Sequence, residues 1–538
     1  RRAPWVVNDP GDGSDANIAD SSCDVDAVTV GDQCTLRAAI ENANAKGGAD
    51  EIDFNLPGSR VIQLGSELPD PNDAALLIDG YTQPGSRVNT SRTVSNAIPG
   101  VTIRGVGSSG GLEGTTIKTA GKNLTLRGLA FTNTGRAVVL SGTHARFNKI
   151  VGDFFGVDAQ GRPDGYAGKA AIWIGAAPDN LVGLRAADDS SVPFPTTVGD
   201  RNVIAGFTDG VIMFNPDAQR NQIANSLIGF RPNGALAHQR CNGIDVDTGP
   251  DDNVIGGVST AMRNVIAGGY CDGVELSHGY DTARDPFTDP TAYEQPWPIE
   301  HNTIRNNWIG FRADGTVDTA FEPGGQRSLT DGAAVNLIDG TDTTTVQGNY
   351  LAGALFGVAI WNPHTSGNVV TRNVIGVGPT DRSASPVGNW GVYLHSSAAG
   401  NTIRGNEIAN TGFGGIGVIG NATQRNRLSQ NTFHDLRTGI GIDIAPFGVA
   451  NPQHPGIPAK GPNLKINAPR ILKATVRGVS GSALTGSRIE VFVSGLYLER
   501  EMRDRGTKRP IAPVPAEPQS PQRLPPPEDG MPHIDVSV

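Results

Sequence analysis

The sequence is poor in the side chains that build a thick hydrophobic core. Of its 538 residues, 6% are aromatic, 37% are hydrophobic and 18% are charged. No run of 18 apolar residues occurs, which excludes an ordinary membrane-spanning helix. Glycine is abundant instead, with 71 residues, but it follows no Gly-X-Y period, which excludes collagen. Few large apolar side chains and many glycines favour thin stacked layers over one thick core.

Positive charge is also scarce. None of the lysines lies between Lys169 and Lys460, and the formal net charge is −10 at pH 7 with a pI of about 5.4. No basic stripe is visible along the sequence. We therefore expect no nucleic acid partner, because binding to a phosphate backbone needs clustered lysines and arginines.

The cysteines are few and fall into two local pairs, Cys23/Cys34 and Cys241/Cys271. Neither pair has the C-x-x-C spacing of a zinc or redox motif, and an even number suits an oxidising compartment. The chain begins with Arg1-Arg2-Ala3 and shows no signal peptide. We expect a mature form of a protein that is secreted or exposed at the cell surface.

A repeated pattern runs from about residue 120 to 445. Each unit has an Asn, alternating apolar positions, a Gly and a second alternating run. Examples begin at Asn202, Asn264, Asn302, Asn373 and Asn401. Units lie roughly 20–35 residues apart, which is typical of solenoids. The local period of two, with β-branched residues on the inner side, predicts strands of three to five residues.

Short strands, Gly and Asn corners and a repeat of one coil together predict an all-β fold, a right-handed parallel β-helix. The alternative, a β-propeller, needs hairpin turns between adjacent strands, and the sequence has few Asn-Gly or Asp-Gly signals there. We expect the corner asparagines to adopt the left-handed backbone conformation and to bond the coils above and below.

Residues 35–45 predict a helix that caps the open end of the solenoid. Leu36, Ile40 and Ala43 share one face, Thr35 is a suitable N-cap, and Gly47 can end the helix. We expect residues 1–120 to form this cap and the first coils, and residues 121–450 to form the β-helix. Residues 451–500 are expected to be a partial β-sandwich-like segment, and residues 501–538 a Pro-rich, disordered tail.

The segment Cys34-Thr-Leu-Arg-Ala-Ala-Ile-Glu-Asn-Ala-Asn44 resembles the CSLREA motif of secreted bacterial proteins with right-handed β-helix repeats of the pectate-lyase-like superfamily. Segments 78–85 and 439–444 are also similar to segments of that group. The resemblance covers about residues 20–495, with Thr35 in place of Ser and Ala38 in place of Glu. It implies the β-helix architecture and a bacterial, secreted protein, and it implies little about chemistry.

Overlaying the strands that follow the second Gly of each unit gives a register for neighbouring coils, which lie about 4.8 Å apart. The outward side chains then form two ladders. The first ladder is predicted to contain Trp173, Ile212, Asp245, Glu275, Ala334, Ala359 and Tyr393, and the second Phe214, Asp247, Ser277, Asn336, Trp361 and His395. Cys241 and Cys271 fall at one equivalent position, so we expect a disulfide between two coils.

These ladders predict a carbohydrate-binding groove with catalytic acids. Asp245, Asp247 and Glu275 lie close together, and crowded carboxylates raise the pKa of one member, which makes a general acid. His278 follows the acid-bearing strand and is a further catalytic candidate. Sugar rings can stack on the flanking aromatic side chains. The predicted substrate-binding residues are Trp173, Phe214, Trp361, Tyr393 and His395 on the ladders, together with Trp297 in an insertion between residues 278 and 302.

The favoured function is therefore a glycoside hydrolase that acts on a polysaccharide and needs no cofactor or metal. In that function Asp245 or Asp247 is the expected acid, and the other one or Glu275 is the base. One alternative is a polysaccharide lyase that binds Ca²⁺ through the acids. Its base would be Arg263, Arg305 or His278, because no lysine occurs from 170 to 459. The other alternative is a non-catalytic surface adhesin or glycan-binding module.

Overall fold

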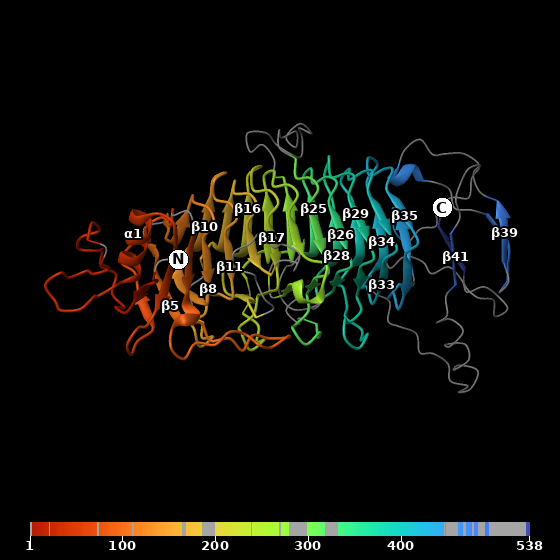
Figure 1. The fold of residues 1–538 in the computed structure, drawn as a ribbon. Coiled ribbons are helices and arrows are strands. Elements are labelled where there is room, and N and C mark those ends of the chain that lie inside the picture. Colours follow the sequence, from red (N-terminus) through yellow and green to blue (C-terminus); the bar gives the residue numbers. More distant parts are fainter. Residues whose placement is uncertain are drawn as a thin grey trace.

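The chain folds into stacked coils that run along one axis (Figure 1). The computed structural model describes residues 3–463 except 21, 73–74, 110–111, 164–167, 185–198, 238, 268, 270, 279–297, 318–331, 439, 446 and 448–460. Beyond these it describes the backbone of 464–465, 470–475, 478–482, 490–493 and 534–537. Each coil contributes one strand to each of three long sheets, and each strand pairs in parallel with the equivalent strand of the next coil. This arrangement is a parallel β-helix and confirms the predicted fold class.

Sheet 1 has 13 strands. In spatial order they are β1 (Trp5–Val7), β2 (Ala49–Phe54), β4 (Ala75–Asp79), β8 (Thr125–Arg127), β11 (Lys149–Val151), β14 (Leu181–Gly183), β17 (Gln222–Ala224), β20 (Val254–Gly256), β23 (Thr303–Arg305), β26 (Thr345–Gln347), β29 (Val369–Thr371), β32 (Thr402–Arg404) and β35 (Arg427–Ser429).

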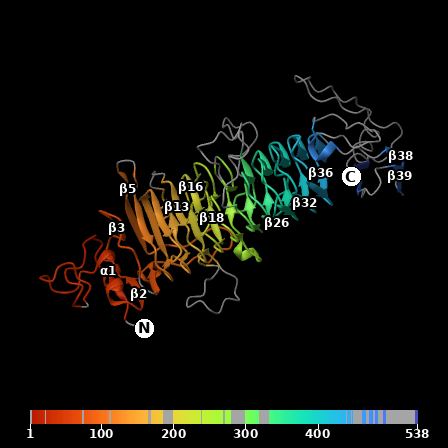
Figure 2. The ribbon, with the colours of Figure 1, turned by 90° about the horizontal axis from the view of Figure 1, so that it is seen from above.

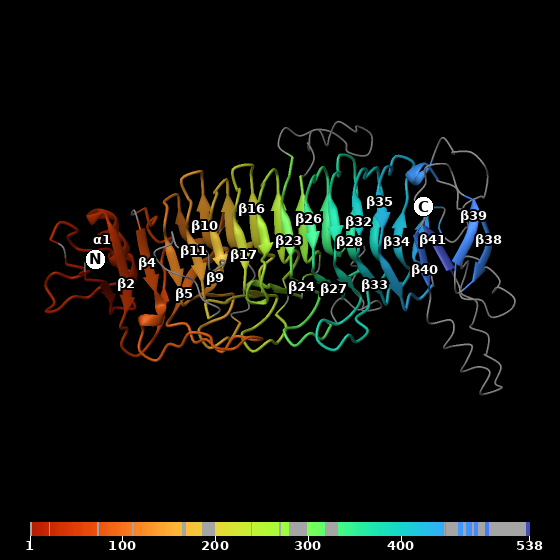
Figure 3. The ribbon, with the colours of Figure 1, turned by 45° about the vertical axis from the view of Figure 1, so that its right-hand side comes forward.

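Sheet 2 has 11 strands and lies beside sheet 1 (Figure 3). In spatial order they are β7 (Thr115–Thr119), β10 (Arg136–Ser141), β13 (Ala170–Gly175), β16 (Asp209–Phe214), β19 (Ile244–Asp247), β22 (Val274–Ser277), β25 (Ala333–Ile338), β28 (Phe356–Ile360), β31 (Trp390–Leu394), β34 (Gly414–Val418) and β37 (Ile442–Ile444).

Sheet 3 closes the coils, and several of its strands are labelled in the view from above (Figure 2). Its strands are β3 (Val61–Gln63), β5 (Val101–Ser109), β9 (Leu129–Thr134), β12 (Phe154–Phe155), β15 (Asn202–Ile204), β18 (Ser226–Ile228), β21 (Val265–Ile266), β24 (Trp308–Ile309), β27 (Tyr350–Leu351), β30 (Val374–Ile375), β33 (Glu407–Ala409) and β36 (Thr432–His434), with β6 (Leu112–Glu113) paired antiparallel to β5.

Two ladders of asparagine join the coils at the two ends of sheet 1. The first contains Asn148, Asn180, Asn221, Asn253, Asn302, Asn368, Asn401 and Asn426, and the second Asn202, Asn264, Asn307, Asn349, Asn373, Asn406 and Asn431. In most steps the amide oxygen accepts the backbone N–H of the equivalent residue one coil earlier. All of these asparagines are buried. The predicted bonding between coils is therefore confirmed.

The prediction that these asparagines adopt the left-handed backbone conformation is wrong. None of the ladder asparagines has a positive φ. The residue that precedes the ladder position carries the left-handed conformation, as at Arg220, Asp252, Asn306 and Arg372. The corner bends one residue earlier, which turns the ladder side chain inward, where it can bond the adjacent coils.

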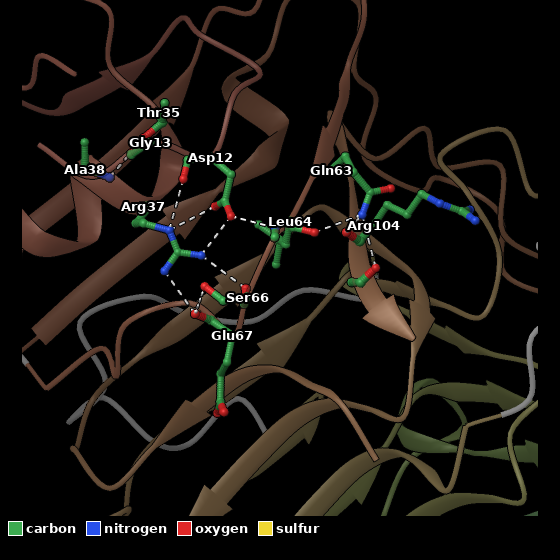
Figure 4. Close-up of polar contacts among 12 residues, drawn as sticks. Asp12, Gly13, Thr35, Arg37, Ala38, Gln63, Leu64, Ser66, Glu67 and Arg104 are labelled. Atoms are coloured by element: carbon green, nitrogen blue, oxygen red, sulfur yellow. Dashed lines mark hydrogen bonds and ion pairs between the residues drawn. The ribbon is translucent and has the colours of Figure 1, made fainter. Parts of the chain in front are cut away.

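The predicted cap helix is α1 (Leu36–Lys46). The side chain of Thr35 accepts the N–H of Ala38, and Gly47 follows the last turn. Arg37 lies buried beside the helix and binds Asp12 through Nε and Nη2, at 3.1 Å to Oδ1 and 2.9 Å to Oδ2 (Figure 4). It also donates to the carbonyls of Ser66 and Glu67, so one guanidinium ties the cap to the first coil.

Toward the C-terminus, β38 (Arg470–Thr475) pairs antiparallel with β39 (Gly478–Ser482). β40 (Glu490–Val493) pairs with β41 (Ile534–Ser537), a strand within the segment expected to be a disordered tail. The domain boundaries stay a prediction, and residues 451–460 and 501–533 lie outside the described residues. Short 3-10 helices in the described ranges are η1 (Gly80–Thr82), η2 (Thr260–Met262) and η5 (Pro462–Lys465). No helix among the described residues is long and apolar enough to cross a membrane.

The predicted disulfide between Cys241 and Cys271 is confirmed, and a second one joins the other pair of cysteines. Cys23 is bonded to Cys34 beside the cap, and Cys241 is bonded to Cys271, which joins the coils of β19 and β22. Disulfides persist in oxidising compartments, so both bonds favour a location outside the cytoplasm.

Candidate functional site

The outer face of sheet 2 has most of the register that the sequence predicts. Along the first ladder Trp173 pairs with Ile212, Ile212 with Asp245, and Asp245 with Glu275. Along the second ladder Phe214 pairs with Asp247, and Asp247 with Ser277. The three predicted acids therefore lie on two adjacent strands, and their side chains are half-buried.

The predicted register is wrong at β25. Asn336, not Ala334, is the partner of Glu275, and Ile338 is the partner of Ser277. Val335 and Leu337 fill the interior in line with Val274 and Leu276. The alternating pattern is weak here because Ala333 and Ala334 are small and suit either face. The observed register places the side-chain amide of Asn336 beside the acids.

A third ladder, missed in the sequence, adds two more carboxyl groups. It contains Asp209, Asn242 and Asp272, all buried, just before the glycines that open β16, β19 and β22. Asp209 Oδ1 accepts the N–H of Asn242, and Asn242 Oδ1 accepts the N–H of Asp272, each at 3.0 Å. Asp272 in turn accepts the N–H of Ala333 and, at 3.0 Å, Nδ2 of Asn336. The repeated Asp-Gly and Asn-Gly dipeptides were the sequence signal for this ladder.

The carboxyl groups of this face perturb one another. Burial raises the pKa of Glu275 to about 9, and the charge of Asp272 and a hydrogen bond with it add to the effect. Burial and the charge of Glu275 also raise the pKa of Asp245 well above its usual range. Burial raises the pKa of Asp247 too, but a hydrogen bond from Thr248 at 2.8 Å opposes the shift. Glu275 therefore keeps its proton at neutral pH, as a general acid requires.

Lys169 is a further residue that sequence reasoning missed. Its Nζ lies 3.2 Å from Asp209 Oδ2, and its charge opposes the rise in the pKa of both Asp245 and Asp247. It immediately precedes β13. In the sequence it lies one residue before the interval that contains no lysine. Arg263 and Arg305, the expected alternative bases, are elsewhere: Arg263 stacks over Trp308 of sheet 3 at 4.5 Å, and Arg305 is on β23 of sheet 1.

His278 is buried directly after β22. It is 3% exposed, and neither ring nitrogen has a hydrogen-bond partner in the described part of the chain. Burial lowers its pKa to about 4, so the imidazole is neutral at pH 7. An unpartnered buried imidazole is costly, which suits a group that bonds a substrate or a moving segment.

Aromatic side chains flank the acids on both sides. Toward the N-terminus Trp173 and Phe214 lie 5.7 Å apart, and the Arg136 guanidinium covers Trp173 at 4.5 Å. Toward the C-terminus the ring of His395 lies 4.5 Å from that of Trp361 and 4.7 Å from that of Tyr393.

Some of these aromatic side chains already contact other side chains of the protein. The Trp361 indole donates to Asn336 Oδ1 at 2.6 Å, and Tyr393 stacks on Phe356 at 5.0 Å. Burial lowers the pKa of His395 to about 4. Trp297, the remaining predicted binding residue, lies outside the described residues.

The described part of the chain has no group of three or more His, Cys, Asp or Glu side chains that could hold a metal ion. A cavity of about 370 Å³ lies away from the acids, between residues 87–98 and the turns around Gly161 and Asn233.

The fold and the face together define a parallel β-helix protein with a row of coupled carboxyl groups between aromatic side chains. No protein-family model matches the chain, and no curated protein matches it in sequence. The resemblance to CSLREA-motif proteins stays a prediction.

Similar solved structures include the periplasmic alginate epimerase AlgG, with 11% identity over 72% of this chain and 75% of that chain, at a TM-score of 0.43. The Dettilon tailspike protein gp208 has 14% identity over 80% of this chain and 68% of its own, at a TM-score of 0.42. The catalytic domain of GH87 α-1,3-glucanase has 10% identity over 82% of this chain and 69% of that chain, at a TM-score of 0.40. The likeness concerns the fold alone.

Proposed function

We propose that the protein is a glycoside hydrolase whose active site is the carboxyl cluster on β16, β19 and β22. The observation that carries this proposal is the placement of three carboxyl groups on one outer face, with Asp245 paired to Glu275 and Asp247 two residues along the same strand. Burial raises the pKa of Glu275 to about 9, whereas a hydrogen bond from Thr248 opposes the rise in the pKa of Asp247. Glycoside hydrolysis needs one protonated carboxyl group and one carboxylate beside the same bond.

In this mechanism Glu275 donates its proton to the glycosidic oxygen as the bond to the leaving sugar breaks. Asp247 is the carboxylate that activates water or stabilises the positive charge on the ring. This assignment reverses the expected role of Glu275 as base. Asp272 is a positioning residue, because it hydrogen-bonds Glu275 and its charge raises the pKa of that carboxyl group.

The substrate is proposed to be an uncharged polysaccharide. Asp209, Asp245, Asp247, Asp272 and Glu275 crowd one face, with Lys169 as the cation beside Asp209. A uronate would meet repulsion there. Trp173 and Phe214 on one side, and Trp361 and His395 on the other, offer ring faces to sugars on both sides of the cleaved bond.

The test is a digest of a glycan panel with mass analysis of the products. Wild type is expected to release saturated oligosaccharides. Glu275→Gln and Asp247→Asn are expected to lower kcat/KM by about 100-fold or more, since each removes a group that transfers or accepts a proton. Asp443→Asn is the matched control, because Asp443 ends the same ladder four strands beyond β25. Unchanged activity in both variants would overturn the proposal.

A lyase is the second candidate, and the position of Lys169 is the observation that favours it. A lyase base removes a proton from the sugar ring, and Lys169 is the cation that the carboxyl groups hold on this face. Products lighter by one water would identify a lyase. Binding without any product, equal in wild type and variants, would leave a glycan-binding module.

A further inference from the structure

The outer face of sheet 1 differs in charge from the rest of this acidic protein. The last strands of the sheet and their corners comprise residues 343–348, 365–373, 398–406 and 423–431. These segments contain Arg372, Arg404, Arg425 and Arg427 and no Asp or Glu. All four arginines are exposed. We call them the arginine patch.

The strand register brings the arginine patch together from distant parts of the sequence. Arg404 on β32 pairs with Thr371 on β29 and with Ser429 on β35, while Arg427 pairs with Thr402. Arg372 directly follows β29, and Arg425 precedes β35 by two residues. Adjacent coils are about 4.8 Å apart, so the four guanidinium groups span about 10 Å along the axis. Figure 1 shows β26, β29 and β35 in succession along this side.

Among the residues that the structure describes, the arginine patch has no carboxylate partner. The ion pairs of other described arginines join Arg37, Arg127, Arg162, Arg220 and Arg382 to acids, and none includes a member of the patch. Arg404 Nε donates to the side chain of Gln430 at 2.7 Å, which leaves its charge uncompensated. In a chain of net charge −10, four adjacent unpaired cations attract an anion locally.

The neighbouring side chains suit a polymer that bonds through oxygen atoms. Outward positions of β23, β26, β29 and β32 carry hydroxyl and amide groups, at Thr303, Thr345, Gln347, Thr371 and Thr402. No aromatic side chain occurs on the outward positions of these strands. Single-stranded nucleic acids bind by stacking their bases on aromatic rings, so this face lacks their usual contact.

We propose that the arginine patch is a docking surface for a linear acidic polysaccharide. Carboxylate or sulfate groups of the polymer pair with the guanidinium groups, and its hydroxyl groups bond the threonine and glutamine side chains between them. The two disulfides favour an oxidising compartment, where acidic polysaccharides are accessible polyanions. The surface lies on a different sheet from the carboxyl cluster, and the proposal does not depend on the hydrolase activity.

The test measures binding of the full-length protein to polygalacturonate and to dextran sulfate, at 20 and 150 mM salt, with neutral dextran as the reference polymer. The patch variant is Arg372→Gln/Arg404→Gln/Arg427→Gln. The control variant is Arg92→Gln/Arg104→Gln/Arg146→Gln, which removes the same charge from exposed sites elsewhere. Circular dichroism checks that both variants are folded.

Wild type and control are expected to bind both acidic polymers at 20 mM salt and more weakly at 150 mM, because salt screens exposed charges. The patch variant is expected to bind about tenfold more weakly than the control. Equal loss in the two variants would show a general charge effect and overturn the proposal. Equal binding of neutral dextran, or complete displacement by single-stranded DNA at lower concentration than by polygalacturonate, would also overturn it.

Discussion

At the scale of single residues, the folded chain holds Glu275 in its neutral form. The buried side chain lies beside Asp272, Asp245 and Asp247, and its pKa is raised to about 9. In the unfolded chain the same group loses its proton near pH 4.5. Between these two values the folded protein binds one more proton than the unfolded chain, so its free energy of unfolding falls as the pH rises.

This linkage predicts that Glu275→Gln makes the protein less sensitive to alkaline pH. Glutamine keeps the size and the hydrogen bonds of a protonated carboxyl group but cannot ionise. From about pH 5 to 9, the variant is expected to gain stability relative to wild type by up to about 1.4 kcal/mol per pH unit. Denaturant unfolding at pH 5, 7 and 9 measures the difference. A constant difference at all three values would contradict the raised pKa.

At the scale of elements, the two asparagine ladders determine how coil joins coil. Asn349 is fully buried and uses both ends of its amide. Nδ2 donates to the carbonyl of Ile304 and to Asn373 Oδ1, and Oδ1 accepts the backbone N–H of Asn307. Each ladder residue therefore satisfies backbone groups of neighbouring coils that the strands leave free at the corners.

Asn349→Ala is expected to destabilise the protein by about 2–4 kcal/mol, because it leaves the N–H of Asn307 and the carbonyl of Ile304 buried without these partners. Asn421→Ala, at an exposed turn, is the control and is expected to have little effect. Urea unfolding followed by circular dichroism compares the two. Equal stability of both variants would show that water replaces the ladder at little cost.

At the scale of the whole molecule, a solenoid has an open end with unpaired strand edges, which promote association between chains. α1 covers the N-terminal end, with Leu36, Ile40 and Ala43 fully buried. The contacts of Arg37 with Asp12, Ser66 and Glu67 hold the helix in place.

Ile40→Asp is expected to displace this cap, because it buries a charge against the first coil. The exposed edge is then expected to produce oligomers, measured by size-exclusion chromatography with light scattering. Ala45→Asp places the same charge on the exposed side of the same helix and is expected to leave the size distribution unchanged. A monomeric Ile40→Asp protein with native circular dichroism would contradict the capping role.

Much of this architecture could be predicted because each coil's neighbours in space are also its neighbours in the repeat. Alternation with period two places Val211, Ile244 and Val274 in one interior row, and the acids beside them follow on the outer face. The same spacing places Cys241 beside Cys271. These features depend only on the pattern within one coil, which the sequence contains in full.

Other features depend on how the chain turns between strands, and only the tertiary structure decided them. The small side chains of Ala333 and Ala334 left the register of β25 open in the sequence, and the fold pairs Asn336 with Glu275. The fold also brings Asp209 and Asp272 into one ladder through Asn242. No basic stripe is visible in the sequence, because Arg372, Arg404 and Arg427 come from different coils and meet only in the stacked sheet. The pattern of residues within one coil is a local property of the chain. The charge on the outer face of a sheet depends instead on the strand register across coils and on the length of each corner.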